Sequence, residues 1–162
     1  MKISSIRRII VLLTALALLL SACNKTITRN GNGSADVETS INQQELQEAI
    51  NAGIADPLIK DLTVSLQSGY IIVSGTRERL NDSSKTDTLS FRLDLGVDNG
   101  QLTASISNTQ FDGFTVEQNR IAHWNTTIAN RIEKLDKNRP NSALKSVVIT
   151  PEAITMTWTV TK

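Results

Sequence analysis

The spacing of apolar residues changes along the chain, and the first region that it marks is a continuous run near the N-terminus. Ile9 to Leu20 is almost wholly apolar, and Lys2, Arg7 and Arg8 precede it. A charged start, an apolar run and small residues before a cleavage point are typical of a secretory signal peptide. As a helix the run would be about 18 Å long, whereas a bilayer core is about 30 Å thick. We therefore expect residues 1–22 to be an export signal rather than a membrane span.

Helical spacing appears between residues 41 and 57. Asn42 is suited to an N-cap, with Glu45 as its capping-box partner and Ile41 placed to pack onto the first turn. The apolar residues then recur on one helical face, at Leu46, Ala49, Ile50 and Ile54. Pro57 ends the pattern, because the residue before a proline avoids the α conformation. These features predict one short amphipathic helix.

The central part of the chain alternates between apolar and polar residues, as strands with one buried face do. The alternation is clearest from Leu89 to Val97. Shorter apolar runs lie at 62–66, 70–73 and 102–106, and turn residues lie at 68–69, 81–84 and 98–100. The pattern predicts an antiparallel meander of four strands.

A second, longer helix is predicted from Val116 to Asn138. Thr115 is its candidate N-cap, and Pro140 stops the pattern. Its apolar residues recur at steps of three and four, at Ile121, Trp124, Ile128, Ile132 and Leu135. Two alternating runs follow, at 147–149 and 154–160, and they predict a final pair of strands.

The predicted order of helix, four strands, long helix and two strands belongs to the α+β fold class. Because each helix has one apolar stripe and each strand one apolar face, we expect a curved antiparallel sheet packed against the long amphipathic helix and the shorter N-terminal helix. Residues 39–162 would form this single domain. The preceding residues, 24–38, are polar and contain two glycines, so we expect a flexible tether there.

Cys23 is the only cysteine, and its neighbours give it a role. Leu20-Ser21-Ala22-Cys23 resembles the lipobox of bacterial lipoproteins. The resemblance implies diacylglyceryl transfer to the Cys23 sulfur, cleavage before Cys23 and acylation of the new amino terminus, for example with palmitate. Residues 23–38 would then be a lipidated cysteine and its tether. The alternatives are a signal peptide that contains a cysteine by chance, or an inert buried thiol.

The anchor also predicts where the protein lies. We expect export and attachment through Cys23 to the outer face of the plasma membrane, or to the outer membrane in a diderm bacterium. Asn24 permits the outer membrane, because an aspartate at that position commonly signals inner-membrane retention.

The 140 residues from Cys23 onward hold 14 basic and 16 acidic side chains, a formal charge of −2, without a basic run. This composition argues against nucleic-acid binding, which needs clustered Lys or Arg.

Residues suited to catalysis are few. His123 is the only histidine, which excludes a multi-histidine metal site within one chain. The sequence contains no nucleophile-elbow, phosphate-loop or zinc-hydrolase motif. Its aspartates are scattered among turns and polar strand faces, where solvation explains them. We therefore expect a protein that is not an enzyme and that holds neither metal nor cofactor.

The apolar face of the long helix has two interpretations. The first is ordinary core packing against the sheet. The second is a lipid-sized apolar groove that helix and sheet leave open, since ligand sites are commonly apolar clefts with few polar groups. The candidate lipid-binding residues are Phe91, Leu93, Leu95, Ile121, Trp124, Ile128 and Ile132. Periodicity does not separate the two interpretations.

A family resemblance favours lipid binding. An amphipathic helix, a proline-containing link and then the segment Leu62 to Thr76, read as LTVSLQSGYIIVSGT, resemble the opening of the LmeA-like phospholipid-binding proteins of bacterial envelopes. The later long strands, long helix and terminal strand pair also resemble them, so the likeness covers roughly residues 41–162. It implies half of a tubular lipid-binding domain, in which a bent antiparallel sheet wraps a long helix and holds acyl chains. It implies no catalytic residues.

Two hypotheses for function follow. The first is a membrane-anchored envelope lipoprotein that binds phospholipid or another lipid in the groove between helix and sheet. The alternative is a non-catalytic scaffolding or protein-interaction module of the envelope with a fully packed core. In the alternative, an outer sheet face or edge would bind another protein or a cell-wall polymer.

Overall fold

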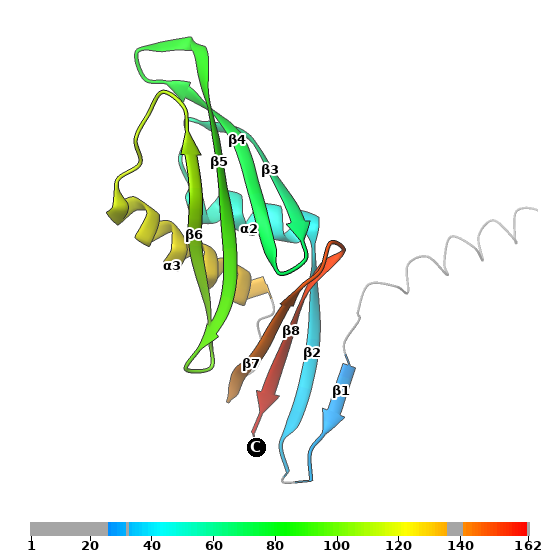
Figure 1. The fold of residues 1–162 in the computed structure, drawn as a ribbon. Coiled ribbons are helices and arrows are strands. Elements are labelled where there is room, and N and C mark those ends of the chain that lie inside the picture. The colour runs from blue at the N-terminus through cyan, green and yellow to red at the C-terminus, as the bar shows by residue number, and fades with distance from the viewer. Residues whose placement is uncertain (1–25, 32, 136–140, 162) are drawn as a thin grey trace, which may run out of the picture.

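The computed structural model describes residues 26–31, 33–135 and 141–161, which form two antiparallel sheets and two helices (Figure 1). The first sheet has the strand order β1-β2-β8-β7, and the second sheet has the order β3-β4-β5-β6. The first sheet consists of β1 (Thr26–Arg29), β2 (Ala35–Asn42), β7 (Ser142–Ile149) and β8 (Ala153–Val160). The second consists of β3 (Ile59–Gln67), β4 (Tyr70–Arg79), β5 (Asp82–Asp98) and β6 (Gln101–Phe111). The helices are α2 (Gln43–Ile54) and α3 (Gln118–Leu135).

The predicted fold class is wrong, because the described chain is mostly strand and its strands form two sheets instead of one curved sheet. The last two strands do not extend the central meander. Instead β8 pairs along its length with β2, from Ala35 opposite Val160 to Asn42 opposite Ala153. The helix α3 packs on α2 and beside β6, an edge strand of the second sheet, so it does not lie across a single enclosing sheet.

Most of the segment expected to be a flexible tether is also folded. The strands β1 and β2 occupy it as a hairpin, in which Thr26 pairs with Glu38 and Arg29 with Ala35. The turn is closed by the Asn30 N–H, which donates to the Ser34 carbonyl at 2.9 Å. In β2 the buried residues Val37, Thr39 and Ile41 alternate with exposed polar ones. The sequence does not show this strand as an alternation of apolar and polar residues, because one of the three buried positions is a threonine.

The first predicted helix and its cap are confirmed. The Asn42 side chain accepts from the Glu45 N–H at 3.0 Å, and the Glu45 carboxylate accepts from the Asn42 N–H at 3.0 Å. The helix α2 ends at Ile54, where Ala55 adopts the left-handed conformation with φ 47°. All four residues predicted for its apolar face are buried, at Leu46, Ala49, Ile50 and Ile54.

The four strands of the predicted meander are confirmed as the second sheet, with changes at one turn. The chain turns at Leu80–Asn81, and β5 already begins at Asp82, inside the segment expected to be a solvated turn. The hairpin between β5 and β6 lies where predicted, with positive φ at Asn99 (49°) and Gly100 (78°). Positive φ at both central residues matches the type I′ turns that join antiparallel strands.

The second helix begins at Gln118, two residues later than predicted, and its predicted end beyond Leu135 lies outside the described residues. It crosses α2 closely at Gly53. A Cβ built on Gly53 would lie 2.8 Å from Ile128 Cγ1 and 3.1 Å from its Cα. The hydroxyl of Thr127 donates to the Gly53 carbonyl at 2.8 Å. Glycine therefore allows the two helices to approach this closely, and a larger residue would force α3 to shift.

One core links both sheets to the helices. It includes Ile41 of the first sheet, Phe91 of the second and Ile128 of α3. Two hairpin ends of the second sheet also touch β7 through backbone hydrogen bonds. Leu144 N–H donates to the Gly100 carbonyl at 2.8 Å, and Gly69 N–H donates to the Ile149 carbonyl at 3.0 Å. These contacts join the edge of the first sheet to the second sheet.

Candidate functional site

The predicted lipidation site and signal peptide lie outside the described residues, which begin at Thr26. The assignment of Cys23 therefore stays a prediction. A helix long and apolar enough to cross a membrane does not occur in the part of the chain that is described.

Six of the seven candidate lipid-binding residues belong to one core that includes α3 and the second sheet, and Ile121 is the exception. Five of them are almost fully buried, with relative exposures from 0 to 3%: Phe91, Leu93, Trp124, Ile128 and Ile132. Leu95 and Ile121 are half-buried, and Leu95 packs against the same core. The five buried candidates and Leu95 share this core with residues of both sheets and α2. The helix is further tied to the sheet by Asn125, whose side chain accepts from the Ile106 N–H at 3.0 Å.

Two surface cavities lie elsewhere. One of about 330 Å³ separates the end of α2 from the start of β3 and is lined by Ile54, Asp56 and Lys60 among others. The other, of about 420 Å³, lies at the β4–β5 hairpin beside Arg79 and Phe114. Neither is lined by any of the seven candidate residues.

The cavity at the β4–β5 hairpin is poorly suited to an anionic ligand. Each of the three basic side chains that line it already forms an ion pair with a carboxylate. The N–O distances are 3.6 Å for Arg77–Asp56, 2.6 Å for Arg79–Asp87 and 3.0 Å for Lys85–Asp82. Asp56 also pairs with Arg120 at 3.4 Å and accepts from the Leu58 N–H at 2.9 Å. Charges that are paired and hydrogen-bonded in this way hold the loop ends together.

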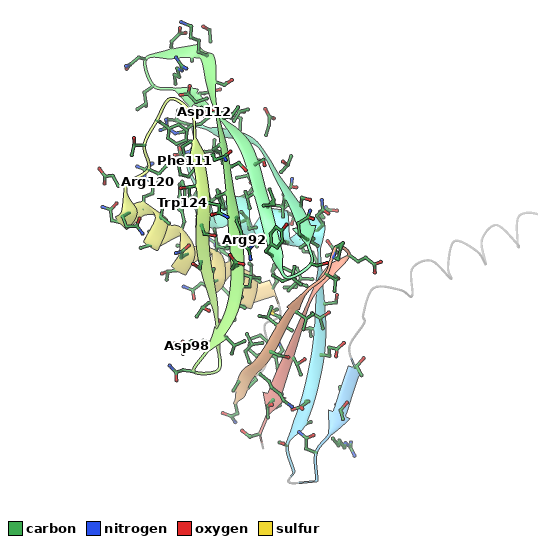
Figure 2. The ribbon with its side chains drawn as sticks, in the orientation of Figure 1. Arg92, Asp98, Phe111, Asp112, Arg120 and Trp124 are labelled. Carbon is green, nitrogen blue, oxygen red and sulfur yellow. The ribbon has the colours of Figure 1, made fainter. Side chains whose placement is uncertain are left out.

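The outer face of the second sheet carries an ordered polar cluster, which we call the Arg92 cluster: Tyr70, Arg92, Asp94 and Ser107. The Arg92 guanidinium donates to Asp94 through Nε at 2.8 Å and also lies 4.2 Å from the centre of the Tyr70 ring. Ser107 lies within 3.5 Å of Asp94. Donation from Arg92 holds the pKa of Asp94 below its ordinary value and raises the pKa of Arg92. Figure 2 shows Arg92 near the middle of the sheet.

The sequence analysis did not identify this cluster as a candidate site. Arg92 and Asp94 alternate with the apolar residues of the predicted strand, and this alternation places them on its polar face without indicating their partners. Tyr70 joins them because the register pairs Ile72 with Arg92, which makes Tyr70 a diagonal neighbour of Arg92 across two strands. The one sequence signal that could have identified the cluster is the presence of aromatic and charged residues on the polar faces of consecutive strands.

A second polar cluster crosses the outer face of the first sheet. Asp36 accepts from Lys145 Nζ at 2.7 Å, from the Thr159 hydroxyl at 2.9 Å and from the Asn30 amide at 3.2 Å. These donors, led by Lys145 and Thr159, hold the pKa of Asp36 below its ordinary value. The contacts link β2 to β8, to β7 and to the β1–β2 turn.

One buried donor lacks an acceptor within the described part of the chain. Trp158 of β8 is 5% exposed, and its indole N–H has no hydrogen-bond partner among the described residues. It shares the inner face of the first sheet with Val37 and Leu144, which lie opposite it on the two neighbouring strands. Because most buried polar groups are paired, such a donor calls for an explanation, for instance a bound water or ligand.

The described residues hold no group of three His, Cys, Asp or Glu side chains placed to bind a metal ion. His123 is exposed on α3.

No protein-family model, curated protein or solved structure matches this chain. The resemblance to the LmeA-like proteins therefore stays a prediction.

Proposed function

We propose that the protein is an exported, lipid-anchored envelope lipoprotein whose folded domain is a non-catalytic protein-interaction module with a packed core. The observation that carries the proposal is the burial of five of the seven candidate groove residues at 0 to 3% exposure. Side chains buried to this degree are occupied by core contacts. Opening a groove among them would expose apolar surface to water, at a free-energy cost of about 25 cal/mol per Å². The outer sheet faces are therefore the better candidates for binding.

The Arg92 cluster is the part of that surface best suited to a protein partner. Tyrosine and arginine are enriched among the residues that dominate protein interfaces. The guanidinium of Arg92 is already held between Asp94 and the Tyr70 ring, so little side-chain freedom remains to be lost on binding. Ser74 and Ser90, 3.5 Å apart between hydroxyl oxygens, extend the same face with small polar side chains.

Site-specific photocrosslinking in the intact envelope tests this proposal. A photoreactive residue at Ser105, which lies opposite Asp94 on β6, should give a discrete protein adduct. Arg92→Ala should weaken the adduct at least tenfold, because it removes the anchor of the cluster while leaving the buried face of β5 intact. Arg131→Ala, at an exposed position of α3, is the matched control and should leave the adduct unchanged. An adduct equally strong in both variants, or no adduct at all, contradicts the proposal.

Lipid binding remains a second candidate because of Trp158. An ester or phosphate oxygen of a lipid would accept from its unpaired indole N–H, and the surrounding inner face is apolar. Residues 24–162, checked for folding by circular dichroism, can be analysed by native mass spectrometry after purification from bacteria. Lipid bound at Trp158 would co-purify as phospholipid and would be lost in Trp158→Phe, which removes the donor and keeps an aromatic ring. Co-purified lipid of this kind would replace the packed-core proposal.

A further inference from the structure

The start of β1 fixes how far the folded domain lies from the predicted anchor. Only residues 24 and 25 separate Cys23 from Thr26, the first residue of β1. Three residue steps span at most about 11 Å even when fully extended. The strand itself is held in place by its pairing with β2 over all four of its residues. This inference rests on the lipid anchor of the proposed function.

The surface nearest to that point is suited to a membrane interface. All four residues of β1 are exposed, and Ile27 is 64% exposed. Arg29 lies on the same face of the strand, because side chains two residues apart in a strand point the same way. Among the described residues, Arg29 takes part in no ion pair that would neutralise it. We call Ile27 and Arg29 the β1 edge.

We infer that the β1 edge lies against the bilayer that holds the Cys23 acyl chains. Each headgroup layer is about 5 to 8 Å deep, which is within the reach of the link from Cys23 to β1. Ile27 would then enter the interface, and Arg29 would face the phosphates of anionic lipids, to which basic residues beside a membrane are attracted. The β4–β5 hairpin would project away, because it and β1 lie at opposite ends of the molecule (Figure 1).

Depth-dependent fluorescence quenching tests the inference on the mature, lipidated protein. The protein would be reconstituted into vesicles of phosphatidylcholine and phosphatidylglycerol, with a fluorophore on either Ile27→Cys or Leu80→Cys. Leu80 is a matched control, because it is an apolar residue, 78% exposed, at the β4–β5 turn. Lipids brominated near the headgroup should quench the label at position 27 at least fivefold more than the label at position 80. Equal quenching at the two positions overturns the inference.

A charge reversal at Arg29 tests whether its charge attracts anionic lipid or whether β1 is simply held near the bilayer by the anchor. Arg29→Glu should reduce quenching at position 27 by about half in phosphatidylglycerol-containing vesicles and should change it little in pure phosphatidylcholine. The same reduction in both vesicles, or none in either, contradicts a contact with anionic lipid. Flotation of the vesicles reports the anchor independently. Protein that does not float shows that the lipid-anchor proposal has failed, whereas protein that floats without selective quenching shows that only this inference has failed.

Discussion

Gly53→Ala provides a quantitative test of the crossing between α2 and α3. Within a helix, alanine is favoured over glycine by about 1 kcal/mol. Here the added methyl group would lie 2.8 Å from Ile128 Cγ1, 3.1 Å from its Cα and 3.2 Å from its N, whereas carbon atoms in contact prefer about 3.5 to 4.0 Å. Two of these three atoms belong to the backbone, so a rotamer change does not relieve the contact and α3 must shift.

Forced shifts of this kind cost about 1 to 3 kcal/mol. Separation of the helices also stretches the 2.8 Å bond from Thr127 to the Gly53 carbonyl, which is worth about 1 kcal/mol. After subtraction of the helix-propensity gain of about 1 kcal/mol, we expect the free energy of unfolding to fall by about 1 to 3 kcal/mol.

Urea denaturation of residues 24–162 measures this change as a lower midpoint at an unchanged m-value. Asn51→Ala is the matched control on the same helix, because Asn51 is exposed and the substitution should stabilise by a few tenths of a kcal/mol. If Gly53→Ala is as stable as the unsubstituted domain, the close approach of the two helices is wrong.

Three further predictions concern the cap, the anchor and the first sheet. Asn42→Ala removes the side-chain acceptor of the Glu45 N–H, one of the two bonds of the capping box, and should lower the free energy of unfolding by about 1 kcal/mol, measured by urea denaturation, with Gln44→Ala as the control. Cys23→Ala should abolish incorporation of labelled fatty acid in growing cells, and unchanged labelling would refute the lipobox assignment. Because the folded-state pKa of Asp36 lies below its ordinary value of 3.8, its contribution to stability is present above that pH and is lost as the pH falls through the folded-state pKa. Asp36→Asn should therefore flatten the pH dependence of the thermal midpoint below about pH 4, and an unchanged slope would count against the Lys145 and Thr159 contacts.

The features that the sequence predicted correctly are those set by neighbouring residues. The capping box joins Asn42 to Glu45, and the β5–β6 turn follows from Asn99-Gly100. The division into two sheets could not be read in this way. It depends on the pairing of Ala35–Asn42 with Ala153–Val160, and the sequence separation of these segments leaves no local signal. The polar composition before residue 39 also concealed β2, whose buried face includes Thr39.

The candidate site shows the same limit. Helical periodicity placed Trp124, Ile128 and Ile132 on one face of α3, where the structure has them. Whether that face meets a packed core or an open groove depends on how completely the neighbouring elements fill the space beside it. The spacing of apolar residues along one helix carries no information about this. Likewise, Arg92 could be placed on a polar face from its strand alone, but its stacking on Tyr70 required the register between two strands.

The short link between Cys23 and β1 changes what the anchor would do. A flexible tether of fifteen residues would let the domain reach about 20 Å and reorient freely. Two linking residues allow about half that distance and attach the anchor to a strand paired in a sheet. The domain would then meet its partners from a narrow range of orientations, which lowers the rotational freedom lost when a complex forms beside the membrane. In this arrangement the Arg92 cluster, on the second sheet, would stay at a nearly constant height above the bilayer.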